Sequence, residues 1–144
     1  MRAAPLAAGI ALGLATALQP AGALACGHCV EDKIAAVYDH SVITRALAEK
    51  HQVVFFAMDG VLTTDEATRQ MLERLAAGSR GVDPGSARVS TDAAALSVAF
   101  DPQRAPLAVV QRELGKKLAA RRLSLLLLRV MDKPAQFKAA SSRP

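Results

Sequence analysis

A short motif near the amino terminus holds both cysteines of this 144-residue chain. It reads Cys26-Gly27-His28-Cys29 and leads directly into a segment with helical spacing. A thiol at the amino end of a helix ionises more readily than an isolated one, and the thiolate is the form that binds soft metals and attacks disulfides. The motif therefore indicates either soft-metal binding or thiol–disulfide exchange.

The first interpretation is a soft-metal site with Cys26, Cys29 and His28 as ligands. Two thiolates are enough for near-linear copper(I), whereas zinc(II) takes four ligands. For zinc(II), the missing ligands could come from His40 or His51, although an isolated His is more often a surface or helix-end residue, or from a partner protein. The pattern thus predicts copper(I) or zinc(II), with copper preferred, exchanged with a metal-donor or metal-acceptor protein.

The second interpretation is a periplasmic thiol–disulfide oxidoreductase. The four residues 26–29 are identical to the active site of protein disulfide isomerases of the thioredoxin family. In that family a strand precedes the motif and a cis-proline loop faces it, whereas here an apolar leader precedes it. A local disulfide or thiol pair without a further role is the third alternative. Haem attachment is excluded because Val30 stands where that motif needs His.

The leader itself determines where the motif is expected to act. Residues 3–25 carry no charge, follow Met1-Arg2 and end in the small-x-small pattern Ala23-Leu24-Ala25. This combination is typical of a signal peptide, and its apolar core is interrupted by Gly and Pro where a membrane-spanning helix needs roughly 20 predominantly apolar residues. We therefore predict a bacterial-type signal peptide at residues 1–25 and export to the periplasm.

Cleavage after residue 25 opens two further possibilities at the new amino terminus. A free amine on Cys26, two backbone amides and the His28 imidazole could hold copper(II) or nickel(II) in a square plane, although the neighbouring thiols favour copper(I). A lipoprotein-type signal would instead lipidate Cys26, which would attach the protein to a membrane and remove that thiol from both interpretations.

Composition excludes several other classes of function. The net charge is +5, with the excess basic residues late in the chain, but one Tyr and no Trp leave little for base stacking, so we expect no nucleic-acid partner. The remaining carboxylates stand at predicted helix starts and turns, and the chain has no Gly-rich phosphate loop. These features give conventional acid–base or phosphoryl-transfer catalysis no evident site, so we favour a binding protein over an enzyme and leave the oxidoreductase as the enzymatic alternative.

Hydrophobic periodicity predicts one compact α+β unit behind the leader. The chain divides into the CxxC segment with an amino-terminal helix (26–51), a strand-and-helix domain (52–131) and a flexible tail (132–144). Within these parts we predict a helix at 30–50, a strand at 52–58, a helix at 64–78, a hairpin of strands at 86–90 and 95–100, a helix at 106–118 and a strand at 123–130. The order after residue 52 is the βαββαβ order of the ferredoxin-like sandwich.

Residues 52–131 resemble the heavy-metal-associated domain. The most specific feature is the strand end Val98-Ala99-Phe100-Asp101-Pro102 followed by a helix, together with Asp59-Gly60 after the first strand. The resemblance implies a ferredoxin-like fold and soft-metal binding by two cysteines in the loop after the first strand. Residues 59–67 contain no cysteine, so no ligand carries over to that loop, and a non-metal interaction module with this fold is a further alternative.

The predicted sheet needs a cover on its second face. Residues 53–56 and 125–128 are apolar at successive positions, which indicates strands buried on both faces. Two helices of a ferredoxin-like sandwich cover one face only, and a bare patch of aliphatic side chains is unusual on a monomer. We therefore predict that the helix at 30–50 lies across the open face, or alternatively that a homodimer forms through it.

Overall fold

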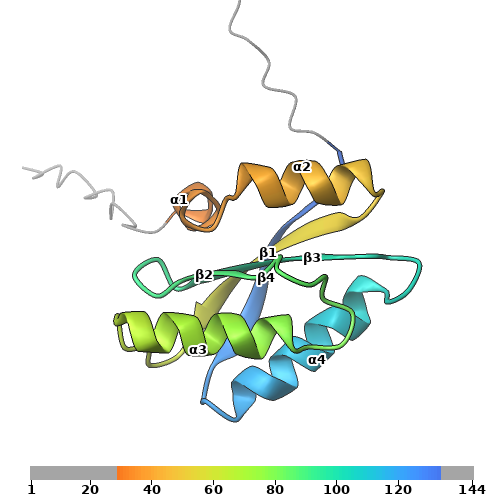
Figure 1. Cartoon of the computed structure of the whole chain (residues 1–144). Coiled ribbons are helices and arrows are strands. Elements are labelled where there is room, and N and C mark those ends of the chain that lie inside the picture. Colours follow the sequence, from red (N-terminus) through yellow and green to blue (C-terminus); the bar gives the residue numbers. More distant parts are fainter. Residues whose placement is uncertain (1–28, 134–144) are drawn as a thin grey trace, which may run out of the picture.

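A computed structural model describes residues 29–133 of the chain. The sheet forms a middle layer between two pairs of helices, with α1 and α2 on one face and α3 and α4 on the other (Figure 1). The predicted signal peptide, the motif residues Cys26 and His28, and the predicted tail from residue 134 lie outside the described residues. None of the described helices is long and apolar enough to cross a membrane.

The sheet has the ferredoxin-like strand order that the sequence predicts. Its strands run β2-β3-β1-β4 with every neighbouring pair antiparallel, and α3 joins β1 to β2 as α4 joins β3 to β4. Each helix therefore links two strands that have one other strand between them, which is the split βαβ arrangement. The bounds of these elements are β1 (Gln52–Asp59), α3 (Glu66–Ala77), β2 (Arg88–Ser90), β3 (Ala95–Phe100), α4 (Leu107–Ala119) and β4 (Ser124–Met131).

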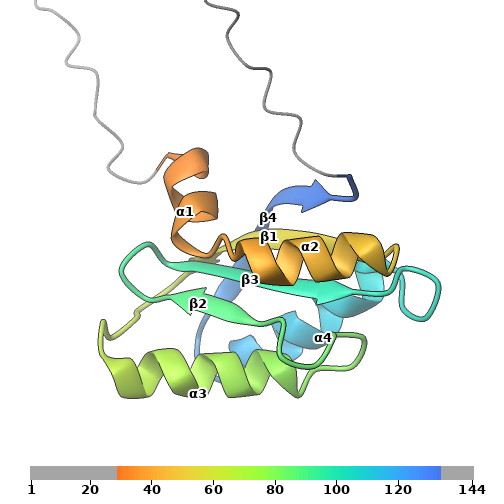
Figure 2. The same ribbon diagram turned by 45° about the horizontal axis from the view of Figure 1, so that its top comes forward.

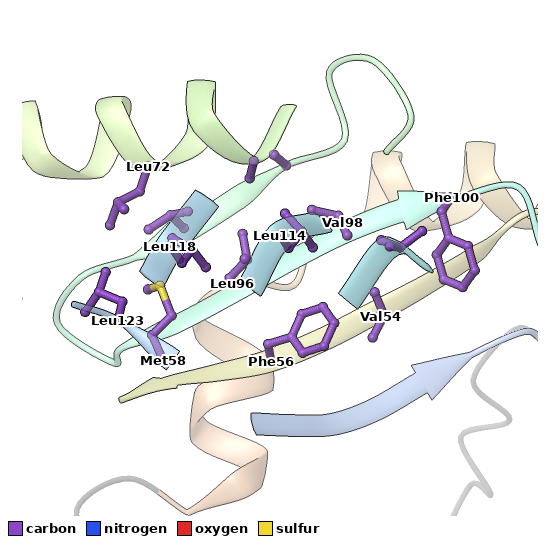
Figure 3. Close-up of a cluster of buried hydrophobic side chains, with 14 of the residues drawn as sticks. Val54, Phe56, Met58, Leu72, Leu96, Val98, Phe100, Leu114, Leu118 and Leu123 are labelled. Carbon is purple, nitrogen blue, oxygen red and sulfur yellow. The ribbon is translucent and has the colours of Figure 1, made fainter. Parts of the chain in front are cut away.

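Alternation along β1 divides the apolar side chains between two cores. Val54, Phe56 and Met58 point to the side of α3 and α4, while Val53 and Phe55 point to the other side. Figure 3 shows the first of these clusters, which we call the body core. It contains fifteen buried residues, among them Leu72, Leu96, Val98, Phe100, Leu114, Leu118 and Leu123.

The second face is covered by the amino-terminal segment, as predicted, but by two helices in place of one. These are α1 (Val30–Ala36) and α2 (His40–Ala48), which together we call the cap. The break comes at Asp39, whose Oδ1 accepts hydrogen bonds from the amides of Ser41 at 2.9 Å and Val42 at 3.2 Å. A side chain that satisfies the first amides of a helix starts a new helix at that point, and the predicted single helix at 30–50 is therefore wrong.

The cap closes its own apolar cluster on the sheet. Figure 2 shows α1 and α2 lying over β1 and β3. The buried Ser97 of β3 donates its hydroxyl to the carbonyl of Val37 at 2.9 Å, which satisfies a backbone group left over at the break. The nine buried residues of this cap core are Ile34, Val37, Val42, Ile43, Ala46, Val53, Phe55, Ala95 and Ala99.

Two strand predictions need correction. β2 begins at Arg88 and not at residue 86, because Ser86 is held in the preceding loop, where its hydroxyl donates to the Asp83 carbonyl at 2.7 Å and accepts the Ala99 amide at 3.0 Å. β4 is not buried on both faces as its four leucines suggest. It is an edge strand, with Leu126 64% and Leu127 39% exposed.

Candidate metal centre

Only one of the three predicted ligands lies within the described residues. Cys29 immediately precedes α1, is exposed, and accepts the amide of Lys33 through its backbone carbonyl at 3.1 Å. Cys26 and His28 stand at most three residues before it in the chain. The position of Cys29 on the fold is thus set by where α1 begins.

Contacts with β4, with the β2–β3 turn and with β3 fix the direction of α1 across the sheet. Near its start, Glu31 Oε1 lies 2.5 Å from Nη2 of Arg129 on β4. Lys33 Nζ donates to the carbonyl of Ala93 in the β2–β3 turn at 2.5 Å, and the chain after α1 contacts β3 through the Ser97 hydrogen bond. The helix therefore begins on the β4 side and ends at β3, and Cys29, which immediately precedes the helix, is on the β4 side.

The histidines that could complete a zinc site do not gather around Cys29. His40 is exposed on the first turn of α2, where its Nε2 lies 3.5 Å from Thr44 Oγ1. His51 instead binds the carboxylate of Asp83, with Nδ1 2.6 Å from Oδ2. Across residues 29–133, no three His, Cys, Asp or Glu side chains are arranged to hold a metal ion.

His51 belongs to a polar cluster that the sequence analysis missed. Besides Asp83, its ring faces Glu49 at 3.6 Å through Nδ1 and Asp101 at 3.8 Å through Nε2. The cluster borders a pocket of about 260 Å³ that Arg45 also lines. These side chains come from the end of α2 and from two loops of the sheet domain, so the cluster fastens the cap to the body. No local pattern could reveal it, because Asp83 and Asp101 lie 32 and 50 residues after His51 along the chain.

A second polar link holds the middle of the cap. The Asp39 carboxylate that starts α2 also accepts a hydrogen bond from Arg88 Nε on β2 at 2.8 Å. The Ser41 hydroxyl, the Val42 amide and the Arg88 guanidinium all favour the charged form and hold the pKa of Asp39 well below its usual range. Asp39 therefore acts both as a helix cap and as a bridge to the sheet edge at β2.

The loop after β1, which in heavy-metal-associated domains carries the metal, is here a packed junction. Gly60 has φ +133°, and a Cβ at this position would lie 2.5 Å from the carbonyl oxygen of Arg122. Asp65 caps α3 by accepting the Thr68 amide at 2.7 Å. Met58, the other soft side chain here, is buried in the body core, as expected for a strand residue. The structure thus gives this loop a structural role between β1, α3 and the α4–β4 turn.

The comparisons with known proteins found matches among solved structures and none among sequences. No protein-family model and no curated protein matches the sequence. Among solved structures, the chain is similar to oxidized MerP from Ralstonia metallidurans CH34 with 18% identity and a TM-score of 0.43, over 55% of this chain and 99% of that chain. It is also similar to a copper binding domain from HMA7, a P-type ATPase, with 18% identity and a TM-score of 0.44, over 55% of this chain and 96% of that chain. The ferredoxin-like assignment itself rests on the strand order and connectivity described above.

Proposed function

We propose that this chain is an exported soft-metal binding or transfer protein that holds copper(I) through Cys26 and Cys29, with His28 as a third ligand. The observation that carries the proposal is the exposed position of Cys29 at the start of α1, a helix fixed to the sheet at both of its ends. Cys29 is thereby presented to solvent at the start of a helix that two polar contacts hold on the sheet. The uncharged apolar leader at residues 3–25, with its small-x-small end, supports a periplasmic location.

The chemistry follows from the softness of the donors. Thiolates select copper(I) and zinc(II) over harder divalent ions, and copper(I) accepts two thiolates without further ligands. An exposed two-thiolate site also allows an incoming thiolate of a donor or acceptor protein to bind the ion before the first pair releases it. Transfer by ligand exchange therefore needs no opening of the fold.

Competition for copper(I) tests the proposal. Residues 26–144, reduced and metal-free, are titrated against a chromogenic copper(I) chelator, beside the variants Cys29→Ser and His40→Ala. Loss of a ligand should weaken copper(I) binding more than about 100-fold, since even residues that only orient ligands cost 10–100-fold. His40→Ala is the matched control, because His40 is exposed on the cap but lies outside the motif, and it should bind as the parent chain does. Equal binding by Cys29→Ser would refute the proposal.

The same preparation distinguishes the thiol–disulfide alternative. A periplasmic oxidoreductase would catalyse the reduction or exchange of a disulfide substrate while free of metal, and Cys29→Ser would abolish that turnover. Copper(I) binding without disulfide turnover supports the metal-binding function. Turnover without copper(I) binding supports the oxidoreductase.

A further inference from the structure

Positive charge gathers on one face of the molecule. The segment 107–122, which forms α4 and the turn after it, holds five basic residues and one acidic residue, whereas the segment 29–50 around the cap holds three basic and four acidic residues. Figure 1 shows α4 and the cap on opposite faces of the sheet. The fold therefore has a cationic face turned away from the cap, and its exposed cations are Arg112, Lys116, Arg121 and Arg122.

Helix stability explains only part of this charge. Cations in the last turn of a helix interact favourably with its dipole, and Lys116 and Lys117 lie there. Lys117 also donates its Nζ to the carbonyl of Gly78 at 2.5 Å, which ties α4 to the end of α3. Arg112 lies in the middle of α4, and its pair with Glu113, at 3.5 Å on the surface, is of a kind that adds little stability. The dipole and the hydrogen bond account for the lysines, and Arg112 needs another explanation.

Arg122 has a backbone conformation that an arginine rarely adopts. Its φ is +59°, in the left-handed region, where the residue after a helix is usually Gly because a Cβ is disfavoured. The amides of Arg121 and Leu123 donate hydrogen bonds to the carbonyl of Leu118, at 2.8 and 3.1 Å, and hold this turn. These bonds use backbone atoms alone, so Gly at position 122 would keep them at lower cost. A residue held in such a conformation is a candidate functional position.

An exposed apolar side chain lies next to these arginines. Val61, in the loop after β1, is 93% exposed. This loop packs closely on the α4–β4 turn, since a Cβ on Gly60 would lie 2.5 Å from the carbonyl oxygen of Arg122. Val61 and Arg121 also line one pocket of about 220 Å³. This end of the molecule therefore combines cations with an aliphatic side chain that the fold leaves uncovered.

A bilayer with anionic lipids matches both features. Each Lys or Arg near such a surface strengthens binding about fivefold. Proteins that rest in the membrane interface combine these cations with aliphatic side chains, which enter the boundary between headgroups and acyl chains. An acidic protein surface would match the cations but would give Val61 no apolar phase to enter. No helix among the described residues can cross a membrane, so the contact would be peripheral.

We propose that the exposed side of α4, the turn at residues 120–123 and Val61 bind the surface of a bilayer that contains anionic phospholipid. The proposal goes beyond the metal-binding function and does not depend on it. In this orientation the cap faces away from the bilayer (Figure 1), which leaves the exposed Cys29, just before α1, accessible from solution.

Co-sedimentation with vesicles tests the proposal through a matched pair of glycine variants. Residues 26–144, produced without the leader, are mixed with vesicles of phosphatidylcholine, with and without phosphatidylglycerol. Arg122→Gly and Lys50→Gly each remove one exposed cation from a position of positive φ, +59° and +61°. Both should unfold at a temperature no lower than that of the parent, because Gly adopts this conformation readily.

The two variants should differ in membrane binding alone. Binding to the anionic vesicles should fall about fivefold in Arg122→Gly and stay unchanged in Lys50→Gly, because Lys50 follows α2 at the end of the cap. No binding of the parent to anionic vesicles, or equal binding by the two variants, overturns the proposal.

Val61→Ser distinguishes a bilayer from an acidic protein. The change keeps the charge and removes the apolar contact, so binding to anionic vesicles should fall about fivefold, as expected for partial burial of a valine side chain. Binding to soluble polyglutamate should stay unchanged. The control is Val30→Ser, since Val30 is 45% exposed at the start of α1 and should leave vesicle binding as it is. Vesicle binding that Val61→Ser leaves unchanged would assign the face to an acidic protein partner and overturn the membrane proposal.

Discussion

The two faces of one sheet are covered in different ways. The body core lies under α3 and α4, which are inserted between strands and cannot leave without breaking the sheet connections. The cap core lies under α1 and α2, which precede the first strand and join the sheet through a single connection before β1. Neighbouring residues such as Phe55 and Phe56, both fully buried, thus belong to covers of different kinds.

This difference explains how the polar links are distributed. Side chains of the amino-terminal segment reach the sheet domain at four places, from Glu31, Lys33 and Asp39 in the cap and from His51 just after it. A cover that is part of the connectivity has less need of such links, because chain closure already holds it in place. The comparison indicates that the cap is the part of the molecule that opens first, and that the motif at its start is carried by this less stable part.

Removal of the cap should cause the largest change in stability among the tests of this difference. A chain that begins at residue 51 re-exposes Val53 and Phe55, each worth about 1.5–3 kcal/mol when buried, together with Ala95 and Ala99. The buried side chains of the cap itself are lost as well. We therefore expect the free energy of unfolding, measured by urea denaturation, to fall by about 5 kcal/mol or more. We also expect the truncated chains to associate through the exposed sheet face. A soluble monomer as stable as the parent would show that the cap contributes no stability.

Substitution of Phe55 or Phe56 should give the next largest loss of stability, and the two variants form a matched pair. Phe56→Ala empties part of the body core and should cost about 3–5 kcal/mol in global stability. For Phe55→Ala we expect a loss of global stability at or below the lower end of that range. The reason is that the cap can open by itself while the rest of the fold stays intact. Amide hydrogen exchange checks this, with protection lost at Val42 and Ile43 in Phe55→Ala and across the sheet in Phe56→Ala.

Equal loss of global stability in the two variants, with cap and sheet amides exchanging together, would contradict the comparison. It would mean that the cap and the body unfold as one cooperative unit.

The sequence predicted the periodic parts of this comparison well. The short apolar run at residues 52–58 and the order of the later elements predicted the ferredoxin-like sandwich, and the apolar second face correctly predicted a cover from the amino-terminal segment. The break at Asp39 was missed because apolar residues keep helical spacing through it, while the capping geometry depends on one carboxylate. The openness of β4 was missed because four leucines in a row are typical of a buried strand, and edge position is set by the sheet order.

The candidate site could be predicted from the sequence less completely than the fold could. The motif at residues 26–29 is evident from residue type alone, but the place of Cys29 on the β4 side depends on the pair of Glu31 with Arg129, 98 residues apart. Long-range ion pairs leave no local pattern in a single sequence. The same holds for the cluster around His51, whose partners come from separate loops.

Asp39 gives a smaller effect that depends on pH. Asp39→Ala removes the cap of α2 and the bridge to Arg88, and should cost about 1–2 kcal/mol. Because the pKa of the Asp39 carboxyl is lowered in the folded chain, its stabilising contribution is complete above about pH 4, the usual range of an unfolded Asp, and is lost as the pH falls toward the folded value. Urea denaturation of the parent and of Asp39→Asn should therefore show a difference at pH 6 that narrows by pH 3. A difference that grows on acidification would contradict this assignment.

The smallest effect comes from the ion pair that places the motif. Glu31 and Arg129 are largely exposed, so Glu31→Gln should change global stability by less than about 1 kcal/mol. The matched control is Asp32→Asn, which also removes an acid from the first turn of α1 but breaks no ion pair recorded in residues 29–133. Both variants alter the helix dipole interaction alike, so any difference between them reports the contact with β4. We expect faster amide exchange at Lys33 and Ile34 in Glu31→Gln than in Asp32→Asn, because only the first variant releases the start of α1 from the sheet edge. Equal exchange in both would mean that packing of Ile34 alone positions the motif, and that the Glu31–Arg129 pair does not.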